Sequence, residues 1–327
     1  MEYYNYPIKN RYLESIDNEN SRTTIGYIFN HSLRTEMILE KDMYNFSRED
    51  IESVMRNISP GTANYAKSSL FHIRSYISWA IKHGYRDNNM NPLDNITGAW
   101  ASKFVDRTSK IHYSEEELED LLSEFHNAQD QAMVRLWFEG AGGREFSEVK
   151  NLSYYDIDWI NNILTLRDES RNERKITVSD KCMKYIENAY RQTNYIFVKD
   201  GEIVSERPLE QSDFILRNVA HRKVDEKTNE IGSGSIYKRL KELKVYFGLD
   251  VFSPNAIRQS GQIYMVSAIY ERDGHFGDKL QWYEIGDRFN VTKVNNNPNV
   301  TMMKNYISTE ILKDLYDLDI KIEKRRS

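Results

Sequence analysis

A segment without a helical or strand period divides this chain into two helical regions. Residues 98–112 show no sustained apolar spacing and carry Lys103 and Arg107. Directly afterwards, Ser114 and Glu117 have the spacing of a capping box and precede a run of leucines at helical intervals, which predicts the first helix of a new domain. Because 327 residues exceed the usual size of one domain, we expect two domains joined by a basic linker over 98–112.

The first domain is expected to be helical over residues 23–97. Ser47 and Asp50 form a capping pattern ahead of an apolar stripe, and a Pro-Gly pair ends that helix. A second helix is expected over 62–83, where apolar residues recur at helical spacing before a glycine. Residues 1–22 show no clear period and are interpreted as an N-terminal arm.

The second domain, residues 113–327, is expected to combine helices with one small sheet. Three short β-like runs cover 154–160, 163–167 and 175–178, and an Asn-Asn turn joins the first two. The rest of the domain is mostly helical in pattern, apart from a polar insert over 199–208. The predicted fold class is therefore mainly α with a small antiparallel β-sheet, in two domains.

The distribution of charge indicates a nucleic-acid partner more clearly than its sum does. The net charge of −5 by itself opposes binding to a phosphate backbone. However, there is no Asp or Glu between Gly61 and Arg86, while 217–244 and the C-terminal tail over 321–326 are rich in Lys and Arg. One basic run is usually a solvated face, but three in an acidic chain are typical of a segregated DNA-binding surface.

The cysteine count and the apolar runs also indicate where the protein is located and which kinds of site it can contain. The only cysteine, Cys182, is expected to be a buried structural thiol rather than a zinc ligand or nucleophile. The first eleven residues lack the apolar core of a secretory signal, and no run approaches the roughly 20 apolar residues that span a bilayer. We expect a cytoplasmic protein with no metal or other cofactor and no membrane partner.

Four short segments, far apart in the chain, follow one another in the order and spacing of the active-site boxes of one enzyme family. They lie at 142–145, 256–259, 285–287 and 304–306. The chain resembles the tyrosine recombinases, and the resemblance runs from about Thr24 to Tyr316. It implies a two-domain DNA clamp and a reaction in which a tyrosine hydroxyl attacks a phosphodiester held by two arginines.

Three residues of that family's site are retained. Arg144 corresponds to the first arginine, Arg258 to the second and Tyr306 to the nucleophile. Each has an ordinary explanation when taken singly, as a surface cation or as one of 22 tyrosines. Their co-occurrence in the family's order is what indicates a phosphate-binding site.

The residues that move protons in the family are replaced. They are Glu169 for the lysine of the β-hairpin, Asn255 for a histidine, Gln259 for a basic residue and Asp287 for a later histidine or tryptophan. A carboxylate or an amide cannot protonate a leaving oxygen at neutral pH as a general acid must. Arg167 or Arg171 could approach the site instead, but a guanidinium is a reluctant acid. We therefore expect no active catalytic residue.

The leading hypothesis is a sequence-specific double-stranded DNA-binding protein that represses transcription of a prophage and maintains lysogeny. Base contacts are expected from a helix that begins near Ser235 and from the helix over 62–83. The candidate DNA-binding residues are Lys67, Arg74, Lys103, Arg107, Arg144, Arg222, Lys223, Ser235, Lys238, Arg239, Lys241 and Arg258. An antagonist protein or peptide is a further candidate partner, near residue 199.

Two alternatives stay open. The chain could be an active tyrosine recombinase that uses Tyr306, with His275 or Lys175 recruited as acid or base. It could also be a nonenzymatic partner of an active integrase, which would bind DNA weakly when alone.

Overall fold

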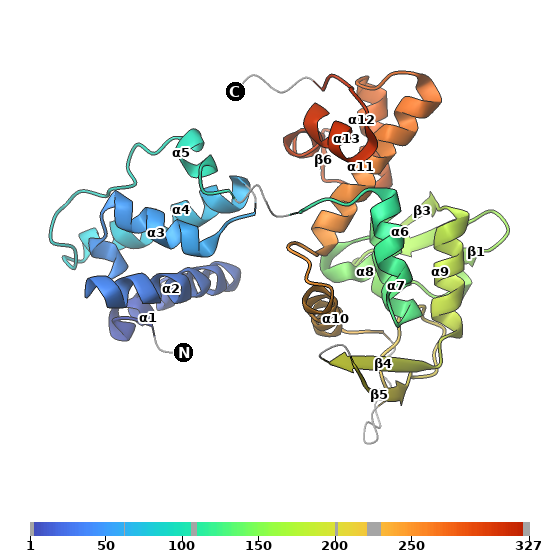
Figure 1. The fold of residues 1–327 in the computed structure, drawn as a ribbon, viewed down its shortest axis with the longest axis horizontal. Coiled ribbons are helices and arrows are strands. Elements are labelled where there is room, and N and C mark those ends of the chain that lie inside the picture. The colour runs from blue at the N-terminus through green and yellow to red at the C-terminus, as the bar shows by residue number, and fades with distance from the viewer. Residues whose placement is uncertain (1–2, 62, 106–109, 200–201, 221–229, 323–327) are drawn as a thin grey trace. The chain divides into compact units, whose positions relative to one another are not determined.

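The computed structural model describes residues 3–61, 63–105, 110–199, 202–220 and 230–322. The chain divides into two compact units, Met1–Ser109 and Lys110–Ser327 (Figure 1). This division lies close to the predicted start of the second domain. Within the described ranges, no helix combines the length and the apolar character that are needed to span a lipid bilayer.

In the N-terminal unit, every described element of regular secondary structure is a helix. Its helices are α1 (Tyr6–Glu14), α2 (Glu19–Leu39), α3 (Arg48–Ile58), α4 (Ala63–Lys82) and α5 (Gly98–Ser102), with a 3-10 turn at Met43–Asn45. The two predicted helices are confirmed as α3 and α4. At the start of α3, the Ser47 hydroxyl accepts from the N–H of Asp50, and the Asp50 carboxylate accepts from the N–H of Ser47 at 2.9 Å.

The expectation of an N-terminal arm is wrong for the described residues. Helix α1 lies in the same core as α2, with Tyr12 buried. The Lys9 ammonium pairs with the Glu36 carboxylate, and both side chains are fully buried. The sequence concealed this helix because a buried ion pair takes the place of an apolar residue in its stripe.

The expectation of a linker over 98–112 is also wrong at its N-terminal end. Helix α5 lies within that range, and Ala101 and Phe104 are buried in the core of the first unit. Lys103 is exposed and forms an ion pair with Glu52, and its ammonium lies 4.8 Å from the centre of the Trp100 ring. Arg107 lies outside the described residues.

The C-terminal unit combines helices with three small antiparallel sheets. The helices are α6 (Glu115–Ser123), α7 (Ala128–Phe138), α8 (Ser147–Lys150), α9 (Asp180–Arg191), α10 (Ser233–Tyr246), α11 (Pro254–Asp273), α12 (Lys279–Arg288) and α13 (Thr309–Tyr316). The strands are β1 (Ile157–Asp158), β2 (Ile163–Arg167), β3 (Glu173–Thr177), β4 (Asn194–Lys199), β5 (Glu202–Pro208), β6 (Lys293–Val294) and β7 (Asn297–Pro298). Short 3-10 turns occur at Arg144–Phe146, Tyr154–Asp156 and Met303–Asn305.

The predicted fold class, mainly α with a small antiparallel sheet, is confirmed. Strands β1, β2 and β3 pair in that order, with Leu164 opposite Ile176 and Leu166 opposite Arg174. The predicted capping box at Ser114 is present at the start of α6. Helix α7 is buried from Ala132 to Phe138 and packs against α9 and α11, so it forms the centre of the unit.

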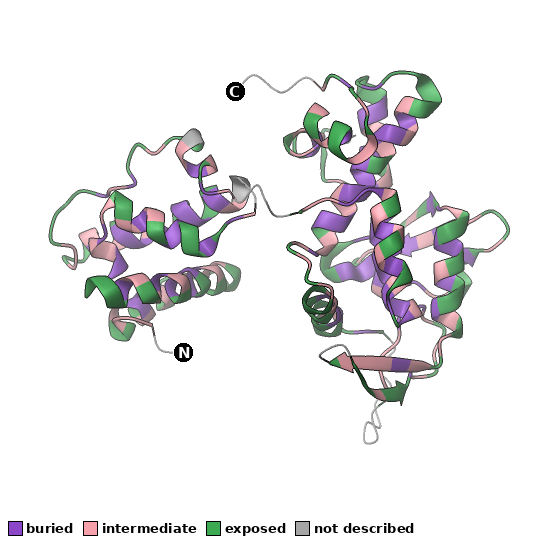
Figure 2. Cartoon of the chain, in the orientation of Figure 1, coloured by how far each residue is buried: buried purple, intermediate pink, exposed green. Residues whose placement is uncertain are grey.

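The polar insert expected over 199–208 is instead part of a β-hairpin. Strands β4 and β5 pair antiparallel, with Asn194 opposite Pro208. Strand β5 is exposed along almost its whole length (Figure 2). It therefore lacks the apolar alternation by which a strand is recognised in sequence. The hairpin lies at the end of the unit opposite to α12 and α13, beside α10 (Figure 1).

Candidate nucleic-acid interface

Arg258 lies in the second turn of α11 and connects three separate parts of the C-terminal unit. The Ser253 hydroxyl caps α11 by accepting from the N–H of Ala256. The Nη1 group of Arg258 donates to the carbonyl oxygen of Gly140 at 2.8 Å and to that of Ala141, and Nη2 donates to the carbonyl oxygen of Phe289. Burial lowers the pKa of Arg258 to about 10. Three of its five N–H groups thus donate to the backbone.

The Arg258 guanidinium leaves no room for a side chain at residue 142. A Cβ atom at this position would lie 2.2 Å from Nη1 of Arg258. Only glycine allows the turn that follows α7 to approach the guanidinium this closely. The Gly142-Gly143 pair indicated no more than a turn in the sequence, but Gly142 is required by the position of Arg258, and a Cβ atom at Gly143 would lie 2.1 Å from Oγ of Ser147.

Arg144 follows this turn on a strained backbone. Gly143 has a φ of 76°, and Glu145 and Phe146 have φ values of 51° and 66°. Left-handed conformations of non-glycine residues cost on the order of 1–3 kcal/mol each and are common where a turn presents a functional side chain. The Arg144 side chain is exposed, and no residue in the described ranges forms a hydrogen bond or ion pair with it.

The ion pair between Glu148 and Arg174 holds the Gly142-Gly143 turn in place. The Glu148 carboxylate is fully covered and accepts from the N–H of Gly142 at 2.6 Å and from Nε and Nη2 of Arg174 at 2.6 and 2.8 Å. Arg174 also donates to the carbonyl oxygen of Arg288. The sequence reasoning missed this pair, because an acid in α8 and an arginine in β3 are adjacent only after the sheet has formed.

The Tyr306 side chain is half-buried, and its hydroxyl has a partner. It donates to Oε1 of Gln262, a buried residue one turn after Arg258 on α11. Burial raises the pKa of Tyr306 well above its ordinary value, and the charge of Arg258 opposes that shift. The structure therefore brings Arg258 and Tyr306 together.

A histidine that the sequence reasoning missed also lies at this site. The His112 ring centre is 6.0 Å from that of Tyr306, and its Nε2 atom is 3.1 Å from Oε1 of Gln259. Burial lowers the pKa of His112. Its place in the expected linker, outside the four motif segments, gave no signal of this role.

The other replaced positions differ in their surroundings. Glu169 is exposed in the turn between β2 and β3 and accepts from the hydroxyl of Ser147 at 3.3 Å, so the turn approaches α8. Asn255 is exposed in the first turn of α11. Asp287 is exposed at the end of α12 and pairs with Lys293 at 2.9 Å, rather than with an arginine. No cluster of three or more His, Cys, Asp or Glu side chains that could hold a metal ion is found in the described part of the chain.

The expectation that Arg239 contacts a base is wrong. Its side chain is only 7% exposed and pairs with Asp130 at 3.5 Å. Nη2 donates to the carbonyl oxygen of Arg217 at 2.9 Å, and the guanidinium lies 4.4 Å from the centre of the Tyr195 ring. Arg239 follows the buried Ile236 by three positions, so it shares the inner face of α10.

The outer face of α10 carries the exposed cations. Lys241 and Lys244 are both exposed and lie on one side of the helix, three positions apart. Ser235 and Lys238 are also exposed, and Lys238 is 3.9 Å from Glu242. The predicted basic helix is thus present, and its exposed cations are Lys238, Lys241 and Lys244 rather than Arg239.

The candidate residues of the N-terminal unit are only partly available. Lys67 is exposed on α4. Arg74 is also on α4, but its Nε and Nη2 atoms donate to one oxygen of Asp94 at 3.0 and 2.7 Å. The candidates Arg222 and Lys223 lie outside the described residues.

Two family models cover most of the chain. Residues 112–317 match the model described as MrpR, C-terminal catalytic domain, and residues 3–82 match the model described as MrpR, N-terminal core-binding domain. The chain belongs to the MrpR family. This membership confirms the predicted phage integrase-type scaffold, in which a core-binding unit precedes a catalytic-type unit.

This MrpR-family chain is similar to one curated protein and to several solved integrase structures. The SPbeta prophage-derived protein YopR of Bacillus subtilis (strain 168) is 27% identical over 325 residues, which cover 96% of each protein. The Tn1549 transposon integrase, solved in complex with transposon right end DNA, is 14% identical, with a TM-score of 0.45 over 92% of this chain and 93% of that one. A lambda integrase dimer bound to a COC' core site is 13% identical, with a TM-score of 0.46 over 89% and 80%.

Proposed function

We propose that this MrpR-family chain is a sequence-specific double-stranded DNA-binding protein that represses transcription of a prophage and maintains lysogeny. In this proposal the recombinase-type site anchors a backbone phosphate and does not cut it. The prophage origin of YopR, a relative across 96% of both chains, supports the prophage setting.

The observation that carries the proposal is the contrast between Arg144 and Tyr306. Arg144 presents an exposed, unpaired guanidinium on a strained turn. Tyr306, the residue that would have to attack, is half-buried with its hydroxyl bound to Gln262. A guanidinium that no described residue engages is suited to holding a phosphate, since a forked cation binds that group in two places, whereas a hydroxyl that already donates to Gln262 is not poised to attack.

Sequence recognition is assigned to the outer face of α10. Lys241 and Lys244 can reach base edges or phosphates once this helix lies along a groove. In the N-terminal unit, we assign the corresponding DNA contact to the exposed Lys67 on α4. Phosphate contacts of this kind supply affinity for all sequences, so specificity must come from the few side chains that reach the bases.

Mapping of bound sites across a lysogen tests the proposal directly. Chromatin immunoprecipitation of the full chain is expected to recover many dispersed sites, which share a sequence and lie at prophage promoters. A reporter joined to such a promoter should be silent with the parent chain and active with the Lys241→Ala, Lys244→Ala double variant. Lys184→Ala, which changes an exposed lysine on α9, is the matched control and should keep the reporter silent. A single bound site at an attachment junction would contradict the proposal.

The competing function is recombination through Tyr306. The observation that favours it is the proximity of His112 and Arg258 to that tyrosine, because an imidazole is a capable acid or base near neutral pH. An active recombinase would need this imidazole to replace the lysine and histidine that the family uses.

A further inference from the structure

A groove runs between β4 and α10 in the C-terminal unit. It consists of two adjoining hollows, one of about 200 Å³ and one of about 50 Å³. The two share four residues of their walls, Tyr195, Phe197, Arg239 and Glu242. The groove thus continues along α10 from Ser235 to Tyr246.

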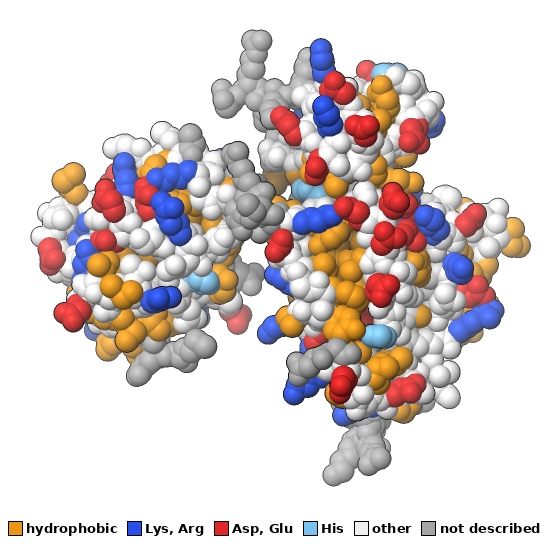
Figure 3. Space-filling model, viewed as in Figure 1, with side chains coloured by type: hydrophobic (Ala, Val, Ile, Leu, Met, Phe, Trp, Pro, Cys, Tyr) orange, Lys and Arg blue, Asp and Glu red, His pale blue; other side chains and the backbone are white. Residues whose placement is uncertain are grey.

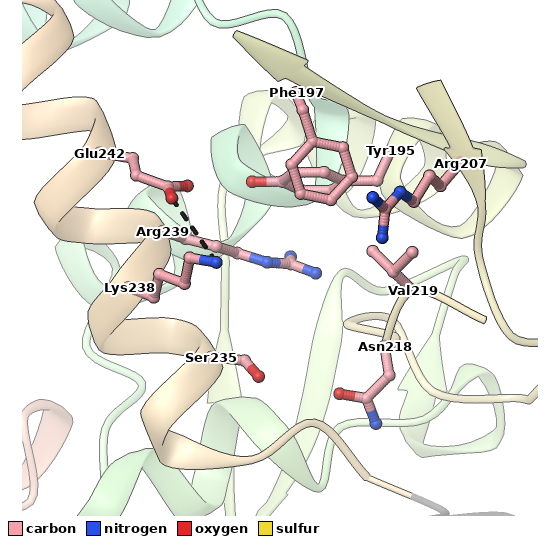
Figure 4. A pocket seen from close by; sticks show the side chains of 9 residues that line it. All are labelled: Tyr195, Phe197, Arg207, Asn218, Val219, Ser235, Lys238, Arg239 and Glu242. Atoms are coloured by element: carbon pink, nitrogen blue, oxygen red, sulfur yellow. Dashed lines mark ion pairs between the residues drawn. The ribbon is translucent and has the colours of Figure 1, made fainter. Parts of the chain in front are cut away.

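The larger hollow has a positive end. Figure 4 shows Arg207 from the hairpin and Arg239 from α10 directed into it from opposite walls, with Lys238 beside Arg239. Asp130 balances the charge of Arg239, and Glu242 is 3.9 Å from Lys238. Arg207 lies 5.4 Å from the centre of the Phe197 ring, and none of the carboxylates in the described ranges pairs with it. Among the described residues, one cation therefore has no counter-charge at this end.

The smaller hollow is lined mainly by apolar side chains, although His126, Asn127, Asp130, Arg239 and Glu242 also border it. Its lining includes Ile196, Val198 and Leu243 together with the rings of Tyr246 and Phe247. On the face seen in Figure 3, apolar side chains gather in a band beside α10 and above β4. A concave apolar surface next to a few convergent polar groups is the usual form of a binding site.

We propose that this groove binds a short, extended peptide segment of another protein, in which a carboxylate side chain lies beside an aliphatic or aromatic one. At about 1.5 Å per residue, the part of α10 from Ser235 to Tyr246 is roughly 16 Å long. An extended segment of about five residues has the same length, at about 3.3 Å per residue.

Charge and shape together select this occupant. The carboxylate of the segment meets the unpaired guanidinium of Arg207, and its apolar neighbour fills the hollow between Phe197 and Tyr246. A nucleic acid fits less well, because it carries a phosphate at every step, whereas the groove places Glu242 midway and apolar side chains at its far end.

Selection from a library of random hexapeptides, displayed on phage and panned against the full chain, tests the inference. The expected outcome is enrichment of peptides with Asp or Glu next to Leu, Ile or Phe. Fluorescently labelled copies of the enriched peptides should bind at least tenfold more weakly to Arg207→Glu. They should bind normally to Lys184→Glu, the matched change of an exposed cation on α9. Tyr246→Ser, at the exposed apolar end, should weaken binding as well and serves as a second variant.

Three results would overturn the inference. The first is a selection that enriches no peptide, and the second is enriched peptides that bind both groove variants as well as the parent. The third is a chain that sediments as a dimer and becomes a monomer in Arg207→Glu, because the occupant would then be a second copy.

Discussion

Replacing Arg258 by alanine is expected to destabilise the C-terminal unit. The change removes the donor that serves three backbone carbonyls, those of Gly140, Ala141 and Phe289. A buried acceptor that loses its donor costs about 1–3 kcal/mol, and water can enter part of the vacated space, so we expect a total loss of about 3 kcal/mol. For a unit of this size each kcal/mol lowers the melting temperature by about 2–4 °C, which gives a fall of roughly 6–12 °C.

Arg144→Ala is the matched variant, since it removes an exposed guanidinium without a partner. Its melting temperature should stay close to that of the parent, because surface changes of this kind usually alter stability by less than about 0.5 kcal/mol. Calorimetry of the two variants measures the difference. In DNA binding, Arg144→Ala should reduce the slope of log affinity against log salt by about one. Equal melting temperatures for Arg258→Ala and the parent would refute the reasoning, because the three carbonyl contacts would then contribute nothing.

Three further outcomes are expected. Arg239→Ala should lose about 3–5 kcal/mol of unfolding free energy, measured by denaturant titration, because it leaves Asp130 buried without a counter-charge; a normal stability with altered base preference would restore the role as a DNA reader. Tyr306→Phe should leave operator affinity unchanged in a mobility-shift assay and cost about 1 kcal/mol of stability through the lost bond to Gln262. Burial lowers the pKa of His112 from its ordinary 6.5, so the folded state favours the neutral imidazole. The stability of the fold is therefore retained above pH 6.5 and lost as the pH falls below it. His112→Gln should show a weaker dependence of the melting temperature on acid pH.

Local signals in the sequence predicted the elements that depend on local chemistry. The capping boxes at Ser47 and Ser114 formed as expected, because each needs only a hydroxyl and an acid three residues apart. The sheet of β1, β2 and β3 could be predicted in part, since β2 places Leu164 and Leu166 inward in regular alternation. The first predicted run, 154–160, was wrong at its start, where residues 154–156 form a 3-10 turn. Arg258 and Tyr306 were brought together as the spacing of the motif segments implied.

Features that depend on distant partners could not be predicted in the same way. Helix α1 is held by the pairing of Lys9 with Glu36, which are far apart in sequence. The sequence cannot show that Arg239 is buried, because its counter-ion, Asp130, lies on a different helix. His112 and Gln262 carry no motif and become site residues only when α11 packs beside the start of the C-terminal unit. In each case the missing information is a contact formed by tertiary packing.

The most direct test of the central claim uses a DNA duplex that carries the bound sequence and a nick beside each candidate cleavage phosphate. Such a substrate traps a covalent protein–DNA adduct whenever a tyrosine attacks. We expect tight binding of the duplex and no adduct with the parent chain on denaturing gels. An adduct that forms with the parent chain and is absent from Tyr306→Phe would contradict it.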